Sequence, residues 1–272
     1  MVNCLNAIRT VGFELYSVMK TLVYTAIFGN KDEAPILLKK KGVDLSDFRF
    51  LCVTDNPELK SEDYEVVLVK SEFSDVTKNA RKIKVNGYGD MSEYDVAIWH
   101  DSSVRLHANQ LAELTNSGNH EILSVFHHRR YCAYMEAIAC IDQNKDSPIR
   151  ITRQMFRYFN EGFPSNFKLH ETTIMVINTD SFVGSKLQQT WWNEVANRSR
   201  RDQLSLAYAR WKTNTEVALL ADTSNSGFNN RFSTYIGHRH VRYEHIGFKL
   251  TLELKIIRVI CKKLIYAMRR HR

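Results

Sequence analysis

Short runs of apolar and β-branched residues recur along the first two thirds of the chain, and polar segments separate them. Runs of this kind that end at Gly, Asn, Asp or Pro are typical of strands. Four of the five residues from Val96 to His100 are apolar or aromatic, which predicts a buried strand. The strands predicted in this way span residues 22–28, 48–55, 65–69, 94–100, 122–126 and 172–177.

The segments between these runs carry helical signals, such as apolar residues at three- and four-residue spacing and Pro148 in a first turn. Strands that alternate with helices predict an α/β protein with a mixed or parallel sheet. A polar stretch rich in Gly, Asn and Ser at 222–231 predicts a long loop. The predicted helices span residues 5–20, 75–85, 104–114, 130–141, 147–159, 181–195 and 202–211.

Composition narrows the class of protein. At 272 residues the chain fits one large domain or two small ones. An apolar share of 44% and a charged share of 25% are typical of a soluble globular protein. The five cysteines are scattered and show no Cys-x-x-Cys spacing, which favours reduced thiols in a cytoplasmic compartment over disulfides or a zinc site.

The formal net charge of +8 is concentrated at the C-terminus. Residues 248–272 hold eight basic residues and one acidic residue, so they account for +7 of it. The remaining +1 argues against a basic groove for nucleic acid. We therefore divide the chain into a domain at 1–247 and a basic amphipathic helix at 248–272. That helix either lies on an anionic membrane surface or packs on the domain as an ordinary terminal helix. No secretory signal and no membrane-spanning run is evident.

Asp101 ends the predicted strand at 94–100 and is followed by two serines. Ligands of open α/β sheets bind at the carboxyl ends of strands. An acid there suits a divalent cation or a sugar hydroxyl. The alternative is a strand that simply ends in an Asx or Ser turn.

Several segments, in their order and spacing, resemble a family of glycosyltransferase-like proteins that was formerly catalogued as a domain of unknown function. The family occurs in bacterial polysaccharide gene clusters and among plant Golgi hexosyltransferase-like proteins. The resemblance covers roughly residues 22–210 and implies a GT-A-like, Rossmann-type mixed sheet flanked by helices. The segments are 24–30, 53–55, 79–84, 94–103, 127–136, 161–166, 191–194 and 199–205.

The resemblance implies a nucleotide diphosphate sugar as donor. Arg offers a planar fork and Lys a point charge to a pyrophosphate. The alternatives are an ordinary strand and turn at the first segment and a solvated basic face at 79–84. The residues implied in donor binding are Thr25, Phe28, Gly29, Asp55, Asn79, Arg81, Lys84, His100, Ser102 and Ser103.

Asp101 would be the counterpart of the Asp-x-Asp metal site of many GT-A enzymes. Mn²⁺ or Mg²⁺ suits oxygen ligands. This sequence has one acid where that motif has two, so any metal held by Asp101 needs further ligands. The candidates later in the chain are His238, His240 and His245.

Asp202 and Asp101 are the candidate catalytic residues. Asp202 would act as a general base on the acceptor or bind hydroxyl groups of the donor sugar. The alternative is an acid placed favourably on a helix dipole. The spacing of Arg130 and Tyr134 predicts one helical face. The residues implied in substrate binding are His127, Arg130, Tyr134, Glu136, Trp192, Arg201 and Gln203.

The resemblance therefore implies a hexosyltransferase that uses a carbohydrate or lipid-linked saccharide acceptor in surface polysaccharide synthesis. We expect it in the cytoplasm, with the C-terminal helix at the inner face of the membrane. The rival hypothesis is a catalytically silent nucleotide-sugar or carbohydrate-binding protein with the same fold.

Overall fold

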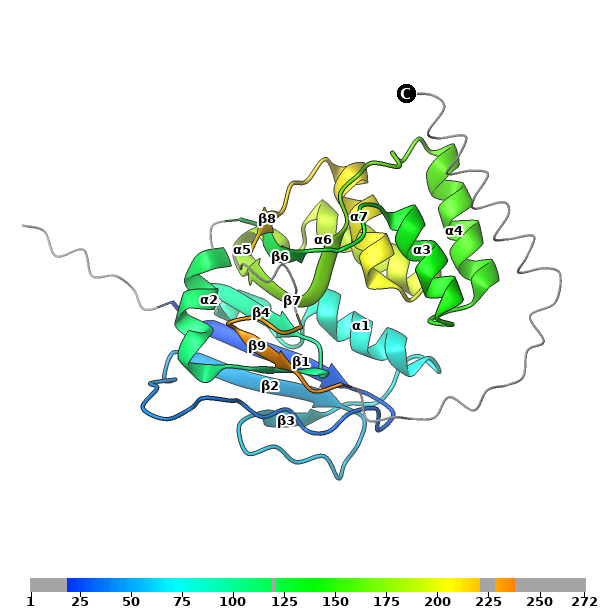
Figure 1. Ribbon diagram of the computed structural model, residues 1–272. Helices are drawn as coiled ribbons and strands as arrows, with labels where there is room; N and C mark the ends of the chain where they lie inside the picture. Colours follow the sequence, from blue (N-terminus) through cyan, green and yellow to red (C-terminus); the bar gives the residue numbers. More distant parts are fainter. Residues whose placement is uncertain (1–18, 119–120, 221–227, 238–272) are drawn as a thin grey trace, which may run out of the picture.

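A seven-stranded mixed sheet forms the centre of the molecule (Figure 1). The computed structural model describes residues 19–118, 121–220 and 228–237. Strands β3, β2, β1 and β4 are parallel neighbours, β7 runs antiparallel to β4 and β6, and β8 is parallel to β6. In sheet order the strands are β3 (Glu65–Leu68), β2 (Phe48–Thr54), β1 (Thr21–Ile27), β4 (Val96–His100), β7 (His170–Asn178), β6 (Leu123–His127) and β8 (Ala218–Leu219).

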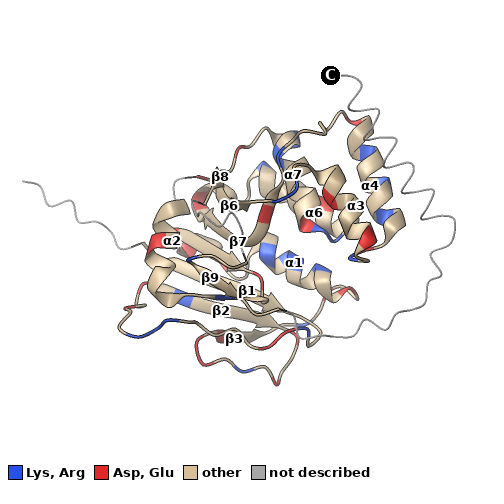
Figure 2. Ribbon diagram, viewed as in Figure 1, with Lys and Arg blue, Asp and Glu red and all other residues tan. Residues whose placement is uncertain are grey.

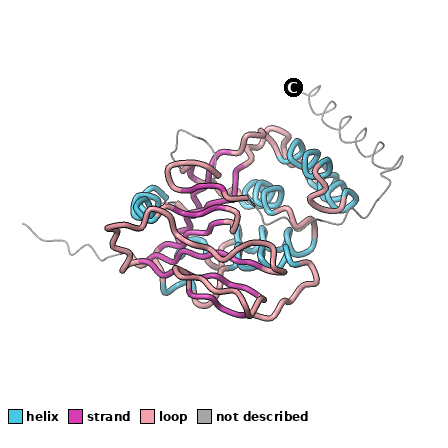
Figure 3. Tube along the Cα trace, turned by 60° about the horizontal axis from the view of Figure 1, so that its bottom comes forward, coloured by secondary structure: helices cyan, strands magenta, loops and turns pink. Residues whose placement is uncertain are grey.

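Helices surround this sheet, as the second view in Figure 3 also shows. Helix α1 packs against β1 and α6, and α7 packs against β7, α3 and α6. The structure thus confirms a mixed α/β sheet flanked by helices. The helices are α1 (Val76–Asn86), α2 (Leu111–Gly118), α3 (Ala133–Asp142), α4 (Pro148–Asn160), α5 (Thr179–Phe182), α6 (Lys186–Asn197) and α7 (Asp202–Thr213), with 3₁₀ turns at Met91–Glu93 and Ala108–Gln110.

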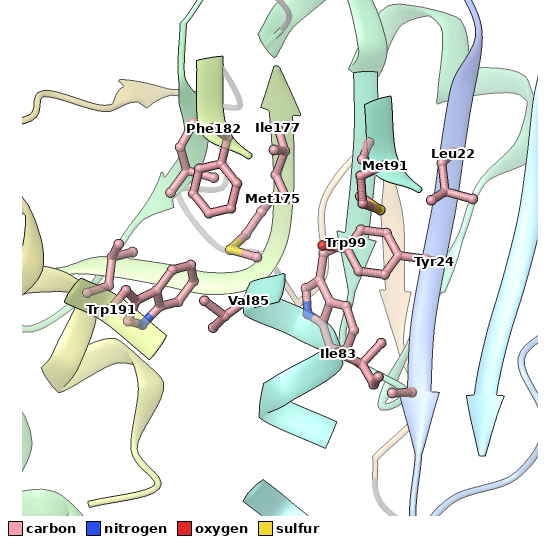
Figure 4. Close-up of a cluster of buried hydrophobic side chains, with 14 of the residues drawn as sticks. Leu22, Tyr24, Ile83, Val85, Met91, Trp99, Met175, Ile177, Phe182 and Trp191 are labelled. Atoms are coloured by element: carbon pink, nitrogen blue, oxygen red, sulfur yellow. The ribbon is translucent and has the colours of Figure 1, made fainter. Parts of the chain in front are cut away.

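Both faces of the sheet are buried, which explains why its central strands are continuous apolar runs. All seven residues of β1 are buried. On one face, Tyr24, Trp99 and Met175 pack against α1 and against Trp191 of α6 (Figure 4). On the other face, residues of the alternate register pack against α2 and the stretch that follows β4.

The helix predicted at 104–114 is wrong in its first half. Val104–Leu106 forms strand β5, which pairs antiparallel with β9 (Ser233–Tyr235). The partner strand is far away in sequence, so no local pattern reveals this pairing, and tertiary context overrides helix propensity. The helix predicted at 181–195 is divided into α5 and α6, because Gly184 between them has a φ of 76°. Strands β8 and β9, of two and three residues, were not predicted.

Several predictions lie outside the described residues. They are most of the helix predicted at 5–20, most of the loop at 222–231, the three late histidines and the basic C-terminal helix with its boundary at 247. Within the residues that the structure describes, no helix is long and apolar enough to cross a membrane.

Candidate functional site

Four charged side chains from three separate elements meet beside the carboxyl end of β4. Arg81 and Lys84 lie three positions apart in α1, whose basic residues are marked in Figure 2. Asp101 follows β4 directly, and Asp202 is the first residue of α7. Their side chains are 15%, 0%, 23% and 1% exposed in that order. We call these four residues the charged quartet.

Lys84 lies at the centre of the quartet. Its Nζ is 2.7 Å from Asp202 Oδ2 and 3.1 Å from Asp101 Oδ1, and it donates to Thr172 Oγ1 at 3.0 Å. Burial lowers the pKa of Lys84, and the two carboxylates oppose this effect. Three oxygens from β4, β7 and α7 thus surround one ammonium group.

Arg81 lies between the same two acids. Its Nη1 donates to Asp101 Oδ1 at 3.2 Å, and its Nε lies 3.0 Å from Asp202 Oδ1. The contact with Asp202 is a charge contact, since the Nε–H group makes no hydrogen bond. Arg81 is thereby held on two sides while part of its side chain stays exposed.

Asp101 is the more accessible of the two acids. Its backbone N–H donates to Thr173 O at 2.8 Å, which fixes the residue against β7. Its Oδ1 accepts three donors: Arg81 Nη1, Lys84 Nζ and Trp99 Nε1, the last at 2.9 Å. Burial raises the pKa of Asp101, but Lys84 and Arg81 outweigh burial and hold this pKa below its usual value. The residue is therefore ionised at neutral pH.

Asp202 is almost completely buried and fully engaged. Thr172 Oγ1 donates to its Oδ2 at 2.7 Å, and the Asp202 backbone carbonyl accepts from Trp191 Nε1 at 2.9 Å. Burial raises its pKa, yet Arg81 and Lys84 bring the pKa far below the ordinary aspartate value. A general base needs access to the acceptor and a pKa near the working pH. The geometry does not support the predicted general-base role of Asp202 and favours a structural role in holding the two cations.

Further contacts fix α1 relative to α7. Asp75 caps α1 by accepting from Thr77 N at 3.0 Å, and both of its oxygens bind Arg200 Nη1 at 3.1 Å. The Asn79 side-chain oxygen accepts from the backbone N–H groups of Glu72 and Phe73. Asn79 therefore holds the turn before α1 in place, and its buried amide is not presented to a ligand.

The loops after β1 and β2 form a second part of the site. Gly29 N donates to Asp55 Oδ1 at 2.9 Å, and Ser71 Oγ donates to Asp55 Oδ2 at 2.8 Å. Asp55 thus holds the loops together. Between them lies a cavity of about 440 Å³. None of its lining residues was predicted as a site residue, although the predicted Gly29 and Asp55 precede two of them in sequence. The cavity is lined by Asn30, Asp32, Glu33, Ala34, Asn56, Glu58, Leu59 and Lys60.

A hydrogen bond links the wall of the cavity to Ser102, the residue that follows Asp101. Ser102 Oγ donates to Asp32, which lines the cavity. Arg105 donates to Ser102 O at 2.8 Å and to Ala34 O at 3.1 Å. The turn signals Gly29-Asn30 and Asn56-Pro57, each after a predicted strand, were the available sequence clue to this cavity.

Four predicted donor-binding residues lie in the interior. Thr25, Phe28, His100 and Ser103 are all at most 3% exposed. His100 Nε2 lies 3.0 Å from Tyr64 Oη, and burial lowers the pKa of His100 to about 4. In this conformation these side chains support the loops and do not reach a ligand.

The residues predicted to bind substrate do not form one cluster. Arg130 precedes α3 and binds Glu136 through a 2.7 Å contact between Nη1 and Oε2. Tyr134 is buried and donates to Phe163 O at 2.9 Å. The prediction of a shared helical face for Arg130 and Tyr134 is wrong, because the helix begins only at Ala133.

Four other residues predicted to bind substrate are partly exposed. Arg201 and Gln203 flank Asp202 at the start of α7 and are partly exposed. Trp192 packs edge-on against Phe73, with ring centroids 5.9 Å apart, whereas Trp191 is fully buried. His127 ends β6 and is also partly exposed.

The surroundings of Asp101 do not fit the predicted metal ion. Among the described residues no group of three or more His, Cys, Asp or Glu side chains is arranged to hold one. Two cations already lie within 3.2 Å of Asp101 Oδ1. Two like unit charges 4 Å apart repel by about 4 kcal/mol at an effective dielectric constant near 20, and a divalent ion beside two cations would meet roughly four times this repulsion.

A family comparison gives the class of this α/β protein, which is glycosyltransferase-like. The chain belongs to the TOD1/MUCI70 glycosyltransferase-like domain family, whose model matches residues 13–234. This match confirms the resemblance found in the sequence. No curated protein matches the chain.

Solved glycosyltransferase structures are similar at low identity. GlyE of Streptococcus pneumoniae TIGR4 is 8% identical with a TM-score of 0.39, and the match covers 75% of this chain and 46% of GlyE. The galactosyltransferase LgtC, solved with donor and acceptor sugar analogues, is 12% identical with a TM-score of 0.39 and 69% of each chain covered. The bifunctional enzyme WbbM is 12% identical with a TM-score of 0.39, and 80% of this chain and 40% of WbbM are covered. This chain thus spans about half the length of GlyE and less of WbbM.

Proposed function

We propose that this protein transfers a hexose from a nucleotide diphosphate sugar to a carbohydrate or lipid-linked saccharide acceptor in surface polysaccharide synthesis. The family supports a transferase. The observation that carries the proposal is the contact of Arg81 with both Asp101 and Asp202, which holds this side chain, 15% exposed, beside the end of β4. The adjoining cavity after β1 and β2 has room for a base and ribose.

In this proposal Arg81 stabilises the charge that develops on the leaving diphosphate. Cations fixed in advance and partly shielded from water stabilise such charge without reorganising during the reaction. Asp101 Oδ1 is occupied by three donors, and no side chain of the described residues donates to Oδ2. Oδ2 is therefore suited to accept a hydroxyl group of the donor sugar.

The acceptor is proposed to bind beside α7 and the segment before α3. Arg130, Arg201 and Gln203 are partly exposed there and offer hydrogen-bond donors, and Trp192 of α6 offers a partly exposed aromatic face. The basic residues at 248–272 support a peripheral position at the inner face of the cytoplasmic membrane. Loss of vesicle binding on deletion of 248–272, with donor binding unchanged, is the result expected from that arrangement.

A thermal-shift and donor-hydrolysis screen of UDP-, GDP- and CMP-sugars tests the proposed activity. Asp101→Asn should lose donor binding and turnover, since the amide is neutral and no longer binds both cations. Asp180→Asn, at an exposed acid in α5, is the matched control and should behave as the native protein. Failure of every donor to bind or turn over would exclude the transferase.

The second candidate is a silent binding protein. It is favoured by Asp202, whose buried carboxylate is already bound to Lys84 and Thr172 and so is not free to act as a base. Stable binding of a nucleotide sugar with no turnover across a panel of acceptors would support this function instead.

A further inference from the structure

The Lys84 ammonium occupies a place that has the character of a cation site. Its three partners are oxygens: Asp202 Oδ2, Asp101 Oδ1 and Thr172 Oγ1, at 2.7, 3.1 and 3.0 Å. Two carboxylates and a hydroxyl are the ligand types that hard divalent cations prefer. The side chain of Lys84 is fully buried, so the ammonium does not compete with water for these oxygens.

The charges within the quartet balance without any added ion. Two carboxylates face one ammonium and one guanidinium, and each cation contacts both acids. Asp101 and Asp202 are thus neutralised by groups tethered to one face of α1, three residues apart. A divalent ion at the same oxygens would have to displace Lys84 or bind despite repulsion from both Lys84 and Arg81.

Lys84 and Arg81 have different exposures and therefore different tasks. Lys84 has no exposed surface, so it cannot contact a diphosphate directly. Arg81 is 15% exposed and held by both acids. Lys84 offsets one of the two carboxylate charges, so the positive charge of Arg81 is opposed by the equivalent of one carboxylate and not two.

We infer that Lys84 takes the place of a divalent metal ion, so that the protein binds its nucleotide donor without one. Lys84 is a positioning residue in this arrangement, and Arg81 is the group that touches the diphosphate. The inference rests on the proposed function, because it concerns how that donor is held.

Calorimetric titration of the native protein with UDP, GDP and dTDP, once in EDTA and once in Mn²⁺, tests the inference directly. We expect at least one nucleotide to bind, with dissociation constants that agree within about threefold between the two buffers. Tightening by Mn²⁺ beyond that range would overturn the inference and leave the proposed transferase intact. Absence of binding in both buffers would overturn the proposed function and the inference with it.

A variant gives a second, independent measurement. Lys84→Ala leaves two facing carboxylates, so nucleotide binding should weaken by about tenfold or more in EDTA and recover in Mn²⁺. Mn²⁺ should also raise the melting temperature of Lys84→Ala and not that of the native protein. A merely structural lysine would show no such rescue, and its absence in a folded variant would count against the inference. Lys82→Ala, on the same helix but paired with Glu72 at the surface, is the matched control. If Lys84→Ala does not fold, the titration of the native protein decides.

Discussion

Lys84 Nζ and Asp202 Oδ2 lie 2.7 Å apart, and neither side chain is more than 1% exposed. This ion pair joins α1 to the start of α7 inside the protein. Removing one partner of such a pair leaves an uncompensated buried charge, which typically costs about 3–5 kcal/mol. The pair is therefore central to stability as well as to the site.

Asp202→Ala should lower the free energy of unfolding by about 3–5 kcal/mol in urea titrations. The double variant Lys84→Met/Asp202→Leu should recover part of this loss, because no buried charge is left alone. Asp180→Ala, an exposed change, should stay within about 0.5 kcal/mol of the native protein. A double variant that is no more stable than Asp202→Ala would contradict this account of the pair.

Arg81→Lys should reduce kcat for donor turnover by about 100-fold, with a smaller change in KM. A lysine keeps the charge but cannot contact both acids through two separate nitrogens. Steady-state kinetics of the variant measures this split. Arg49→Lys is the matched control, because Arg49 pairs with Glu65 at the amino end of β2, away from the site. Equal kcat values for Arg81→Lys and the native protein would remove Arg81 from the chemistry.

Gly29→Ala should destabilise the protein by more than Gly42→Ala. Both glycines have a positive φ, 68° and 74°, at which a side chain costs of order 1 kcal/mol. Only at Gly29 would the added Cβ also meet a neighbour, Val76 Cγ1 at 2.8 Å, since nothing lies within 4 Å at Gly42. Chemical unfolding of both variants separates the cost of backbone strain, which is common to both, from the cost of the steric clash, which occurs only at Gly29. Adding Val76→Ala should restore part of the stability that Gly29→Ala loses. Equal losses at the two positions would show that the contact with α1 is unimportant.

His100 should make stability depend on pH between about 6.5 and 4. Burial lowers its pKa from 6.5 to about 4, so the folded protein holds the neutral ring. The contribution of this group is complete above pH 6.5 and is lost as the pH falls toward 4, because the unfolded chain binds the proton first. His100→Gln removes the titration and should flatten the pH dependence of the unfolding free energy in this window. An unchanged slope would assign the dependence to other groups.

The local pattern was sufficient for most of the sheet and failed where partners are distant. The strands at 22–28, 48–55 and 94–100 appear within a residue or two of their predicted bounds, because strands buried on both faces must be apolar throughout. Val104–Leu106 was predicted as part of a helix, since its pairing with Ser233–Tyr235 depends on residues far along the chain. The two-residue strand β8 is too short to leave a pattern.

The sequence by itself determined where the main strands run and which charged residues were candidates for the site. Asp101 was singled out because it ends an apolar run, whereas Arg81 and Lys84 were implied in donor binding by the family resemblance. Only the tertiary structure decided what these groups do. It brings Asp202, about a hundred residues later, against Arg81 and Lys84, and it buries Lys84 among three oxygens where a metal was predicted. The physical reason is that burial and charge pairing arise from the packing of α1, β4, β7 and α7 together, and residue spacing along one segment carries no information about it.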